Sequence, residues 1–543
     1  MLSVCWVTSM RVNIIGAGLA GLSAALALAK EGIECNLFSV QQSERAQSVM
    51  AEGGINAVLD TMNEDDKIEY HIKDTMDGGA NLADPNAVDG LCHSAPGIVR
   101  ELEQLGVPFG KNEKGIVQRS FGGQKKKRTA FVKSSTGKML MTAMIDAVRE
   151  YEAKGLVYRY PHHRLEDLIV RRDECCGAVI SDIFTGDVYE FYGSVIMATG
   201  GMNGLFEEMT TGSMLNTSDA AAIALERGVE LANLEFIQYH PTTIAIQGKR
   251  MLISEAARGE GGRLYVKRRG YKWYFMEEKY PELKNLMPRD VVSAEMVKVT
   301  SRAECDDQVF LDMTEIPEMI WDTRLSDLRE QCINYLNIDP VSQPVPVSPG
   351  IHYFMGGVRV DEEHRTSLAN CYAAGECACQ YHGANRLGGN SLLGAIYGGK
   401  IAAQSVLKYA DRDALYRRNA LEDVPAQNVS PSLSKRITEI LASSLQIIRH
   451  EATLNNSIKE IKMLLTDDIN SAERRRLHLA QAVLLSAKSR RESRGAHKRT
   501  DYPEKDEVNF HKLTVARMNG DEVEITFLDI PERRETENHG NTD

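Results

Sequence analysis

The sequence predicts an α/β protein in which a Rossmann-type nucleotide-binding domain is interrupted by an α+β insertion and followed by a helical domain. Three observations support this prediction. The chain opens with a strand, glycine turn, helix and strand; residues 237–350 differ in composition from their flanks; and residues 431–490 place apolar side chains at helical spacing. We expect the nucleotide-binding domain over 11–236 and 351–410, the insertion over 237–350, the helical domain over 411–500, and a strand-like segment with a charged tail over 501–543.

Composition excludes several classes of protein. At 543 residues the chain is too long for one core, and its 43% hydrophobic and 26% charged residues are typical of soluble globular proteins. The net charge of −12 argues against a nucleic-acid partner. We interpret the basic runs 125–128 and 267–269 as solvated loops, with docking of a partner protein as the alternative. No apolar run approaches the roughly 18 residues of a membrane helix.

The first ten residues and the cysteines indicate how the chain begins and whether it binds a metal. Residues 1–10 lack the features of a signal peptide, so they are interpreted either as a disordered lead or as an extension upstream of a true start at Met10. The ten cysteines show no convincing zinc or iron–sulfur spacing. We therefore expect reduced thiols in a cytoplasmic protein, and no metal or cluster of its own.

The nucleotide-binding prediction comes from residues 12–38. A short apolar strand at 12–15 runs into GAGLAG at 16–21, which supplies the pattern G-x-G-x-x-G, and a second strand follows at 35–38. Glycines at these positions let the backbone bend tightly and approach a pyrophosphate at the start of the helix. Ser39 stands where an acidic residue usually ends the second strand, which removes one argument for NAD.

Further strands are predicted at 168–171, 178–183, 188–191 and 194–198. The last of these runs into the glycine turn ATGG, and a buried strand at 371–374 ends in Gly375 and Glu376. Polar clusters lie within or beside the insertion. They are FIQYHPTT (236–243), ISEAARGEGG (253–262), MPRD (287–290), GIHYFMGG (350–357) and HGANRLGGNSLL (382–393). Histidine, arginine and hydroxyl groups in this density suit a small dianion, because two carboxylates need two anchors.

These clusters resemble those of the flavoprotein subunits of fumarate reductase and succinate dehydrogenase, a family that includes L-aspartate oxidase. The resemblance runs from about Val12 to at least Thr514. It implies FAD in a glutathione reductase-like domain, with residues 237–350 as the capping domain. The residues that it implies for FAD are Gly16, Ala17, Gly18, Gly21, Ser39, Gln47, Gly53, Gly54, Asp219, Glu376, Ser391 and Leu392. Asp219 lies in TSDA where the family reads TGDG, so we expect a slightly different backbone there.

The resemblance also implies roles in catalysis. His240 and Ser254 would hold one substrate carboxylate, and His352 with Arg386 the other. Arg289 would donate a proton, with Glu255 and Arg258 as a relay towards solvent. A guanidinium has a pKa above about 12, so it can serve only because hydride addition to a conjugated alkene leaves a strongly basic carbanion. The alternative is that Arg289 only clamps charge.

Two positions distinguish members of the family. Phe121 precedes Gly122–Gly123 where aspartate oxidases carry an acidic residue, and an apolar ring cannot pair with the ammonium group of an amino acid. The stretch 494–517 also follows the fumarate and succinate branch. Gln47 replaces the histidine that carries FAD covalently in respiratory members, so we expect non-covalent FAD and a bias towards fumarate reduction.

The resulting prediction is the catalytic flavoprotein subunit of a fumarate reductase-type complex, which interconverts fumarate and succinate. It implies an iron–sulfur partner subunit and leaves open a membrane-anchor subunit that would hold the protein at the cytoplasmic face. The alternatives are L-aspartate oxidase, a reductase of another unsaturated carboxylic acid, and a non-catalytic flavin-binding scaffold.

Overall fold

The computed structural model describes residues 10–133, 135–246, 248–410, 417–421 and 428–534. Met10 is buried, whereas the rest of the first ten residues lie outside the described part, as do the last nine residues of the predicted tail. No helix within the described ranges is both long enough and apolar enough to cross a bilayer.

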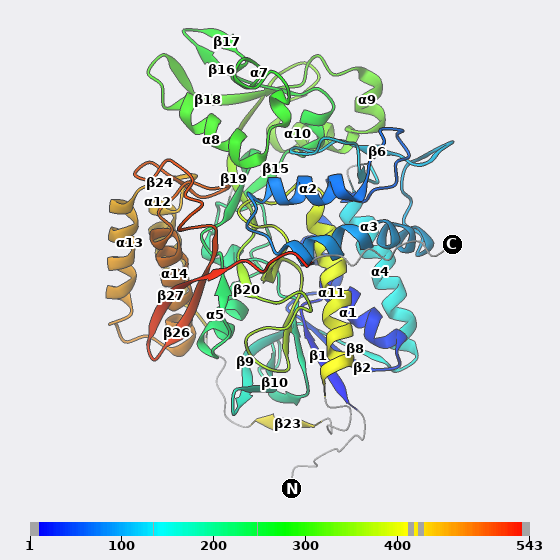
Figure 1. Cartoon of the computed structure of the whole chain (residues 1–543), viewed down its shortest axis with the longest axis vertical. Coiled ribbons are helices and arrows are strands. Elements are labelled where there is room, and N and C mark those ends of the chain that lie inside the picture. Colours follow the sequence, from blue (N-terminus) through cyan, green and yellow to red (C-terminus); the bar gives the residue numbers. More distant parts are fainter. Residues whose placement is uncertain (1–9, 134, 247, 411–416, 422–427, 535–543) are drawn as a thin grey trace.

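A five-stranded parallel sheet forms the centre of the nucleotide-binding domain, in the order β21-β12-β1-β2-β8. β1 is buried along its whole length, as expected for a strand of a covered parallel sheet. Helix α1 packs against α11 and α4 beside this sheet (Figure 1). The bounds are β1 Arg11–Ile15, α1 Leu19–Lys30, β2 Glu34–Ser39, α4 Thr136–Ala153, β8 Val157–Pro161, β12 Val195–Met197, β21 Cys371–Ala373 and α11 Asn390–Tyr409. The strands predicted at 12–15 and 35–38 are thereby confirmed.

A second, antiparallel sheet has the order β23-β11-β10-β9. Three of its strands confirm the prediction from alternating apolar residues, and β23 joins from much further along the chain. The bounds are β9 His163–Arg171, β10 Glu174–Asp182, β11 Val188–Tyr192 and β23 Arg418–Leu421.

The capping domain is built on a six-stranded sheet in the order β15-β14-β19-β18-β16-β17, and it lies at the top of Figure 1 in green. Its own apolar core contains Phe275, Leu311 and Trp321, so it has an interior separate from that of the nucleotide-binding domain. The bounds are β14 Ile237–Ile246, β15 Lys249–Leu252, α6 Ala256–Gly259, β16 Arg263–Arg268, β17 Tyr271–Trp273, α7 Phe275–Lys279, α8 Arg289–Thr300, β18 Cys305–Asp312, α9 Glu318–Thr323, α10 Ser326–Leu336 and β19 Val345–Phe354.

The helical domain packs on the opposite side from α1 and α4 (Figure 1). Its apolar residues share one core with α5 and the antiparallel sheet, because Leu441 and Leu484 fall in the same cluster as Ile223 and Phe191. The bounds are α5 Asp219–Glu226, α12 Pro431–Ser444, α13 Glu451–Leu464 and α14 Ser471–Ser489.

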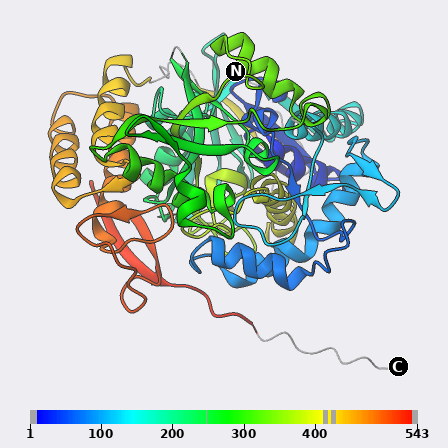
Figure 2. The same ribbon diagram turned by 90° about the horizontal axis from the view of Figure 1, so that it is seen from above.

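The predicted strand-like end forms β26 (Lys512–Asn519) and β27 (Glu522–Asp529). These strands complete a sheet of order β22-β20-β13-β26-β27. The bounds of its other members are β13 Leu231–Ala232, β20 Gly357–Arg359 and β22 Ala378–Cys379. Figure 2 shows β26 and β27, in red, beside the helical domain, and residues 532–534 beyond them contact Asn86 and Asp89. The C-terminal segment is therefore part of a sheet with the interrupted first domain.

One surface prediction is wrong. Arg128 ends the basic run that we interpreted as a solvated loop, yet its side chain is 0% exposed. It pairs with Asp66 and Asp74, each at 2.9 Å. Lys125 and Lys127 of the same run are exposed as predicted. Composition alone could not separate the buried cation from its solvated neighbours, because its partners lie more than fifty residues away in sequence.

Candidate active site

Most of the predicted residues line one cleft between the nucleotide-binding and capping domains. From the nucleotide-binding turn these are Gly16, Ala17, Gly18, Ser39, Gln47, Gly53 and Gly54. From the polar clusters and their surroundings they are Phe121, His240, Ser254, Glu255, Arg289, His352, Glu376, Arg386, Ser391 and Leu392. Gly21, Asp219 and Arg258 do not line this cleft.

The glycine turn forms a cradle at one end of the cleft. Gly16 has φ of +113°, and a Cβ on it would lie 2.1 Å from the carbonyl oxygen of Ala198. A Cβ on Gly21 would lie 1.8 Å from the carbonyl oxygen of Gly16, so Gly21 brings α1 against the turn. Gly18 is the N-cap of α1 and lines the cleft. The amide groups at the start of this helix suit a pyrophosphate.

The end of β2 forms the next part of the wall. Ser39 lines the cleft, and its hydroxyl donates to the carbonyl oxygen of Gln41. Arg45 lines the same region and supplies a positive charge there. Arg45 was not among the residues predicted from the sequence, although a basic residue shortly after the second strand of a dinucleotide fold was a usable signal.

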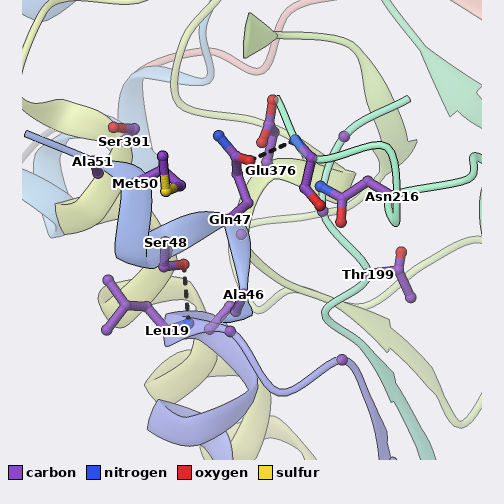
Figure 3. Close-up of a pocket in the computed structure, with 18 of the residues that line it drawn as sticks. Leu19, Ala46, Gln47, Ser48, Met50, Ala51, Thr199, Asn216, Glu376 and Ser391 are labelled. Atoms are coloured by element: carbon purple, nitrogen blue, oxygen red, sulfur yellow. Dashed lines mark hydrogen bonds between the residues drawn. The ribbon is translucent and has the colours of Figure 1, made fainter. Parts of the chain in front are cut away.

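Gln47 connects two walls of the cleft. It begins the 3-10 helix Gln47–Met50, and its side-chain oxygen accepts a 2.6 Å hydrogen bond from the backbone N–H of Ser213 (Figure 3). The hydroxyl of Ser48 accepts a hydrogen bond of 3.3 Å from the N–H of Leu19 in α1. This short helix is therefore fastened to the loop before α5 and to the glycine turn.

Gly53 and Gly54 form the turn after this helix, and each is required for a different reason. Gly54 has φ of +140°, and a Cβ there would lie 2.5 Å from the carbonyl oxygen of Ala130. A Cβ on Gly53 would approach Cζ of Phe121 to 3.0 Å. The turn thus lets the Phe121 ring lie against the backbone beside the substrate clusters.

Glu376, Ser391 and Leu392 lie deeper in the cleft. Glu376 accepts a hydrogen bond of 3.2 Å from the N–H of Phe354, and burial raises the pKa of its carboxyl to about 7. Ser391 and Leu392 lie in the first turn of α11, after Gly389 with φ of +84°. A further helix start therefore lines the cleft, and its free N–H groups favour electron-rich ligand atoms.

The residue directly before α5 has a backbone conformation that favours glycine, although it is a serine. Ser218 has φ of +73°, in the left-handed region. Ser218 and Ala220 line the cleft, while the Asp219 carboxylate accepts a 2.5 Å hydrogen bond from Arg476 of α14. Within the described residues, Asn216 Nδ2 and Ser218 Oγ are buried without a hydrogen-bond partner. These free polar atoms in a glycine-walled cleft fit a dinucleotide cofactor such as FAD.

Two histidines meet at the far end of the cleft. The rings of His240 and His352 are 5.1 Å apart, edge to face. Burial and then the charge of Arg289 hold the pKa of both imidazoles well below the usual range. Nδ1 of His352 contacts the hydroxyl of Thr211 at 2.8 Å, whereas Nε2 of His240 has no partner in the described part of the chain. Ser254 accepts from the N–H of Ala256, which leaves its hydroxyl proton free.

Arg386 faces this histidine pair. Its guanidinium lies 4.5 Å from the centroid of the Tyr353 ring and donates to Gln238 at 3.1 Å. Burial, followed by repulsion from Arg289, lowers its pKa to about 9. Gln238 was missed by the sequence analysis, although it stands two residues before His240 in the same cluster. Its side-chain oxygen also accepts from Arg289 at 3.0 Å, so one amide joins the two arginines.

Arg289, Glu255 and Arg258 form one buried ionic chain. Glu255 accepts from Arg289 at 2.6 and 3.0 Å and from Arg258 at 3.1 Å. Burial raises the pKa of the Glu255 carboxyl, but the two arginines outweigh burial and lower it to about 2. The geometry brings together the three residues that we expected to move a proton.

The outer end of this chain is buried. The Arg258 side chain is 0% exposed, and it donates to the backbone carbonyl oxygen of Asn285 at 2.6 Å. Any route from Arg258 to bulk water must therefore pass through further groups or water molecules. The three-residue spacing of positions 255 and 258 places them on one side of the short helix α6, but spacing could not indicate what covers Arg258.

Comparison with known proteins adds independent information. Residues 11–392 match a family model described as FAD binding domain, and residues 469–537 match one described as fumarate reductase flavoprotein C-term. The chain is 35% identical to the succinate dehydrogenase flavoprotein subunit of Bacillus subtilis, over 93% of each chain. It is 34% identical to the fumarate reductase flavoprotein subunit of Mycobacterium tuberculosis, over 94% of this chain and 95% of that one. A solved quinol fumarate reductase variant from E. coli superposes with a TM-score of 0.84 over 96% of each chain, at 28% identity.

Proposed function

Because the chain belongs to the family of succinate dehydrogenase and fumarate reductase flavoproteins, we propose that it is the catalytic flavoprotein subunit of a fumarate reductase-type complex. Family membership makes it an FAD-dependent oxidoreductase that acts on CH–CH groups, which confirms the predicted class of enzyme, the cofactor and the fold. Family membership does not assign the roles of individual residues, the non-covalent binding of FAD or the direction of the reaction, and these three points are proposed here.

The observation that carries the proposal is that two sets of carboxylate-binding donors and the ionic chain line the same cleft. His240 and Ser254 offer donors for one carboxylate, and His352 with Arg386 for the other. Arg289 lines this cleft and is held there by Glu255 and Gln238. A four-carbon dicarboxylate fits this pattern chemically, since each of its ends needs directional donors and its centre must face an acid.

Each residue then has a distinct task in fumarate reduction. His352 and Arg386 hold one carboxylate and draw electron density from the double bond, while His240 and Ser254 fix the other end. FAD, when bound, supplies the hydride that adds to one alkene carbon. Arg289 gives one proton to the neighbouring carbon, and a second proton then reaches it from Arg258 through Glu255. One hydride and one proton together convert fumarate to succinate.

Gln47 and Phe121 refine the assignment. A carboxamide offers no ring nitrogen for attachment, so FAD is bound without a covalent bond, which favours reduction of fumarate over oxidation of succinate. Phe121 is 2% exposed and places an apolar ring where an ammonium group would need a carboxylate, which disfavours aspartate as substrate. The electrons come from an iron–sulfur subunit, with or without a membrane anchor at the cytoplasmic face.

The test compares three substrates on the FAD-loaded protein without oxygen. We expect fumarate to reoxidise the reduced protein faster than succinate reduces the oxidised protein, and we expect aspartate to give little turnover. The same artificial donor or acceptor should be used throughout. Ready oxidation of aspartate without any reaction of fumarate would replace the assignment with aspartate oxidase, and turnover of only larger unsaturated acids would replace the substrate.

A further inference from the structure

The Glu255 carboxylate, which comes from the capping domain, is enclosed by two glycines of the nucleotide-binding domain. A Cβ on Gly122 would lie 2.3 Å from Oε1 of Glu255, and a Cβ on Gly388 would lie 3.2 Å from Oε2. The backbone N–H of Gly122 also donates to Oε1 at 3.2 Å. Each carboxylate oxygen thus contacts a glycine from a segment far away in sequence.

Backbone conformation does not explain these two glycines. Gly122 and Gly388 lie outside the left-handed region, whereas their neighbours Gly123 and Gly389 have φ of +83° and +84°. The second glycine of each pair is needed for its dihedral angle. The first is needed for space, and the space is taken by the carboxylate.

The carboxylate has no room to retreat without losing its partners. Arg289 holds Oε2 through two nitrogens and Arg258 holds Oε1, while the Glu255 side chain is 2% exposed. An alanine methyl group at position 122 would therefore push Oε1 away from Arg258 and from its backbone donor. Hydrogen bonds weaken steeply with such changes in distance and angle.

We propose that Gly122 and Gly388 form a socket that positions the Glu255 carboxylate between Arg289 and Arg258. This inference rests on the proposed function, because it concerns the proton relay of that reaction. Both glycines act through Glu255 and are positioning residues. The socket and the carboxylate belong to different domains, and Gly123 N–H donates to the Leu286 carbonyl oxygen at 3.2 Å across the same boundary. The carboxylate therefore reaches the socket only when the capping domain lies against the nucleotide-binding domain.

The first test is Gly122→Ala in the FAD-loaded protein. We expect kcat for fumarate to fall about tenfold or more, because acid–base steps are worth ~10²–10⁴-fold. FAD content, the midpoint of thermal unfolding and dicarboxylate affinity should change little, and the solvent isotope effect on kcat should rise as proton transfer becomes limiting. Gly110→Ala is the matched control: the site is exposed, a Cβ there meets nothing within 4 Å, and kcat should stay at the wild-type value.

The second test is a double-mutant cycle with Glu255→Asp. The shorter side chain withdraws the carboxylate from position 122, so adding Gly122→Ala to Glu255→Asp should lower kcat by less than twofold. A full multiplicative loss in this background would overturn the socket, because the damage would then not act through Glu255.

Gly388→Ala serves if Gly122→Ala does not fold. The added Cβ at position 388 would lie 3.2 Å from Oε2 of Glu255, a milder clash than that at position 122, so we expect a smaller fall in kcat. We also expect weaker dicarboxylate binding, since the same Cβ would lie 3.2 Å from Cβ of Phe121. Wild-type kcat in both alanine variants would overturn the socket and leave the proposed function standing. A wild-type protein that converts neither fumarate nor succinate would overturn the function and the relay with it.

Discussion

A single guanidinium, that of Arg289, is the group for which position matters most. It donates to Glu255 through two nitrogens and to Gln238 through the third, so its orientation is fixed before substrate binds. A lysine ammonium carries the same charge but cannot occupy these directions at once. A role for Arg289 as a charge clamp and a role as a proton donor therefore predict different outcomes for Arg289→Lys.

We expect Arg289→Lys to lose nearly all turnover while retaining FAD and binding dicarboxylates only modestly less well. The loss should appear mainly in kcat, since proton delivery is felt in the transition state. Steady-state kinetics and dicarboxylate titration of the variant provide the measurement, with Arg359→Lys, a half-buried arginine paired with Glu230 outside the cleft, as control. More than about a tenth of wild-type activity in Arg289→Lys would reduce Arg289 to a charge clamp, because acid–base steps are worth ~10²–10⁴-fold.

Ser218 allows a residue-scale test of backbone strain. A non-glycine residue at φ of +73° is held in a region that costs about 1–2 kcal/mol. Ser218→Gly should remove this cost, offset partly by the greater freedom of glycine in the unfolded chain, and so stabilise the protein by about 0.5–1 kcal/mol. Thermal unfolding of the FAD-free variant isolates the backbone effect from any bond between the hydroxyl and the cofactor. A lower unfolding midpoint than wild type would contradict the strain.

Among the elements, α2 (Ile68–Gly78) carries a buried histidine outside the catalytic cluster. Nε2 of His71 contacts the side-chain oxygen of Asn390 at 3.0 Å, which ties α2 to the start of α11. Burial, then the charge of Arg128, lowers the pKa of His71 to about 3. The imidazole is thus neutral in the folded protein at a pH where the unfolded chain would protonate it.

Its contribution to stability has a definite sign. The contribution is present above the unfolded pKa of about 6.5 and is lost as the pH falls towards 3, because unfolding then takes up a proton. The slope reaches at most about 1.4 kcal/mol per pH unit. We expect the unfolding midpoint of wild type to fall more steeply between pH 6.5 and 4.5 than that of His71→Gln, which can still donate to Asn390. His93→Gln removes an exposed histidine of α3 (Pro85–Gln104) as a control. Equal slopes for wild type and His71→Gln would refute the linkage.

At the scale of elements, the features that depend on local sequence pattern were predicted from the sequence. The glycine turn, the strands at 12–15, 35–38 and 188–191, and the α+β insertion follow from periodicity, glycine spacing and composition. The partners of Arg128 and Asp219 did not follow, because Asp66, Asp74 and Arg476 are joined to them only by the tertiary fold. The same limit explains why Gln238 and the burial of Arg258 escaped notice.

At the scale of the whole molecule, the cleft is walled by segments from residue 15 to residue 395, and these segments belong to both the nucleotide-binding and the capping domain. Much of what joins the two domains along this cleft is polar: Glu255 bonds to Gly122, and Gly123 bonds to Leu286. A cofactor in the cleft adds contacts on both sides at once. FAD binding is therefore expected to stabilise the domain arrangement as well as to supply chemistry.

This expectation can be measured because nothing at position 47 can hold the flavin covalently. We expect acid precipitation to release all FAD into the supernatant, whereas colour that stays with the denatured chain would contradict the non-covalent assignment.

We also expect the unfolding midpoint to rise with added FAD, since a ligand that binds only the folded state stabilises it by about 2.7 kcal/mol at one hundred times its Kd. Gln47→Ala removes the 2.6 Å hydrogen bond to Ser213 that joins two walls of the cleft, so FAD should dissociate faster from this variant. Gln446→Ala is the control: this residue is exposed in the loop after α12, and its loss should not change the dissociation rate. An unfolding midpoint that is independent of free FAD would show that the domains hold together without it, and an unchanged rate in Gln47→Ala would show that the bridge at Ser213 does not retain the cofactor.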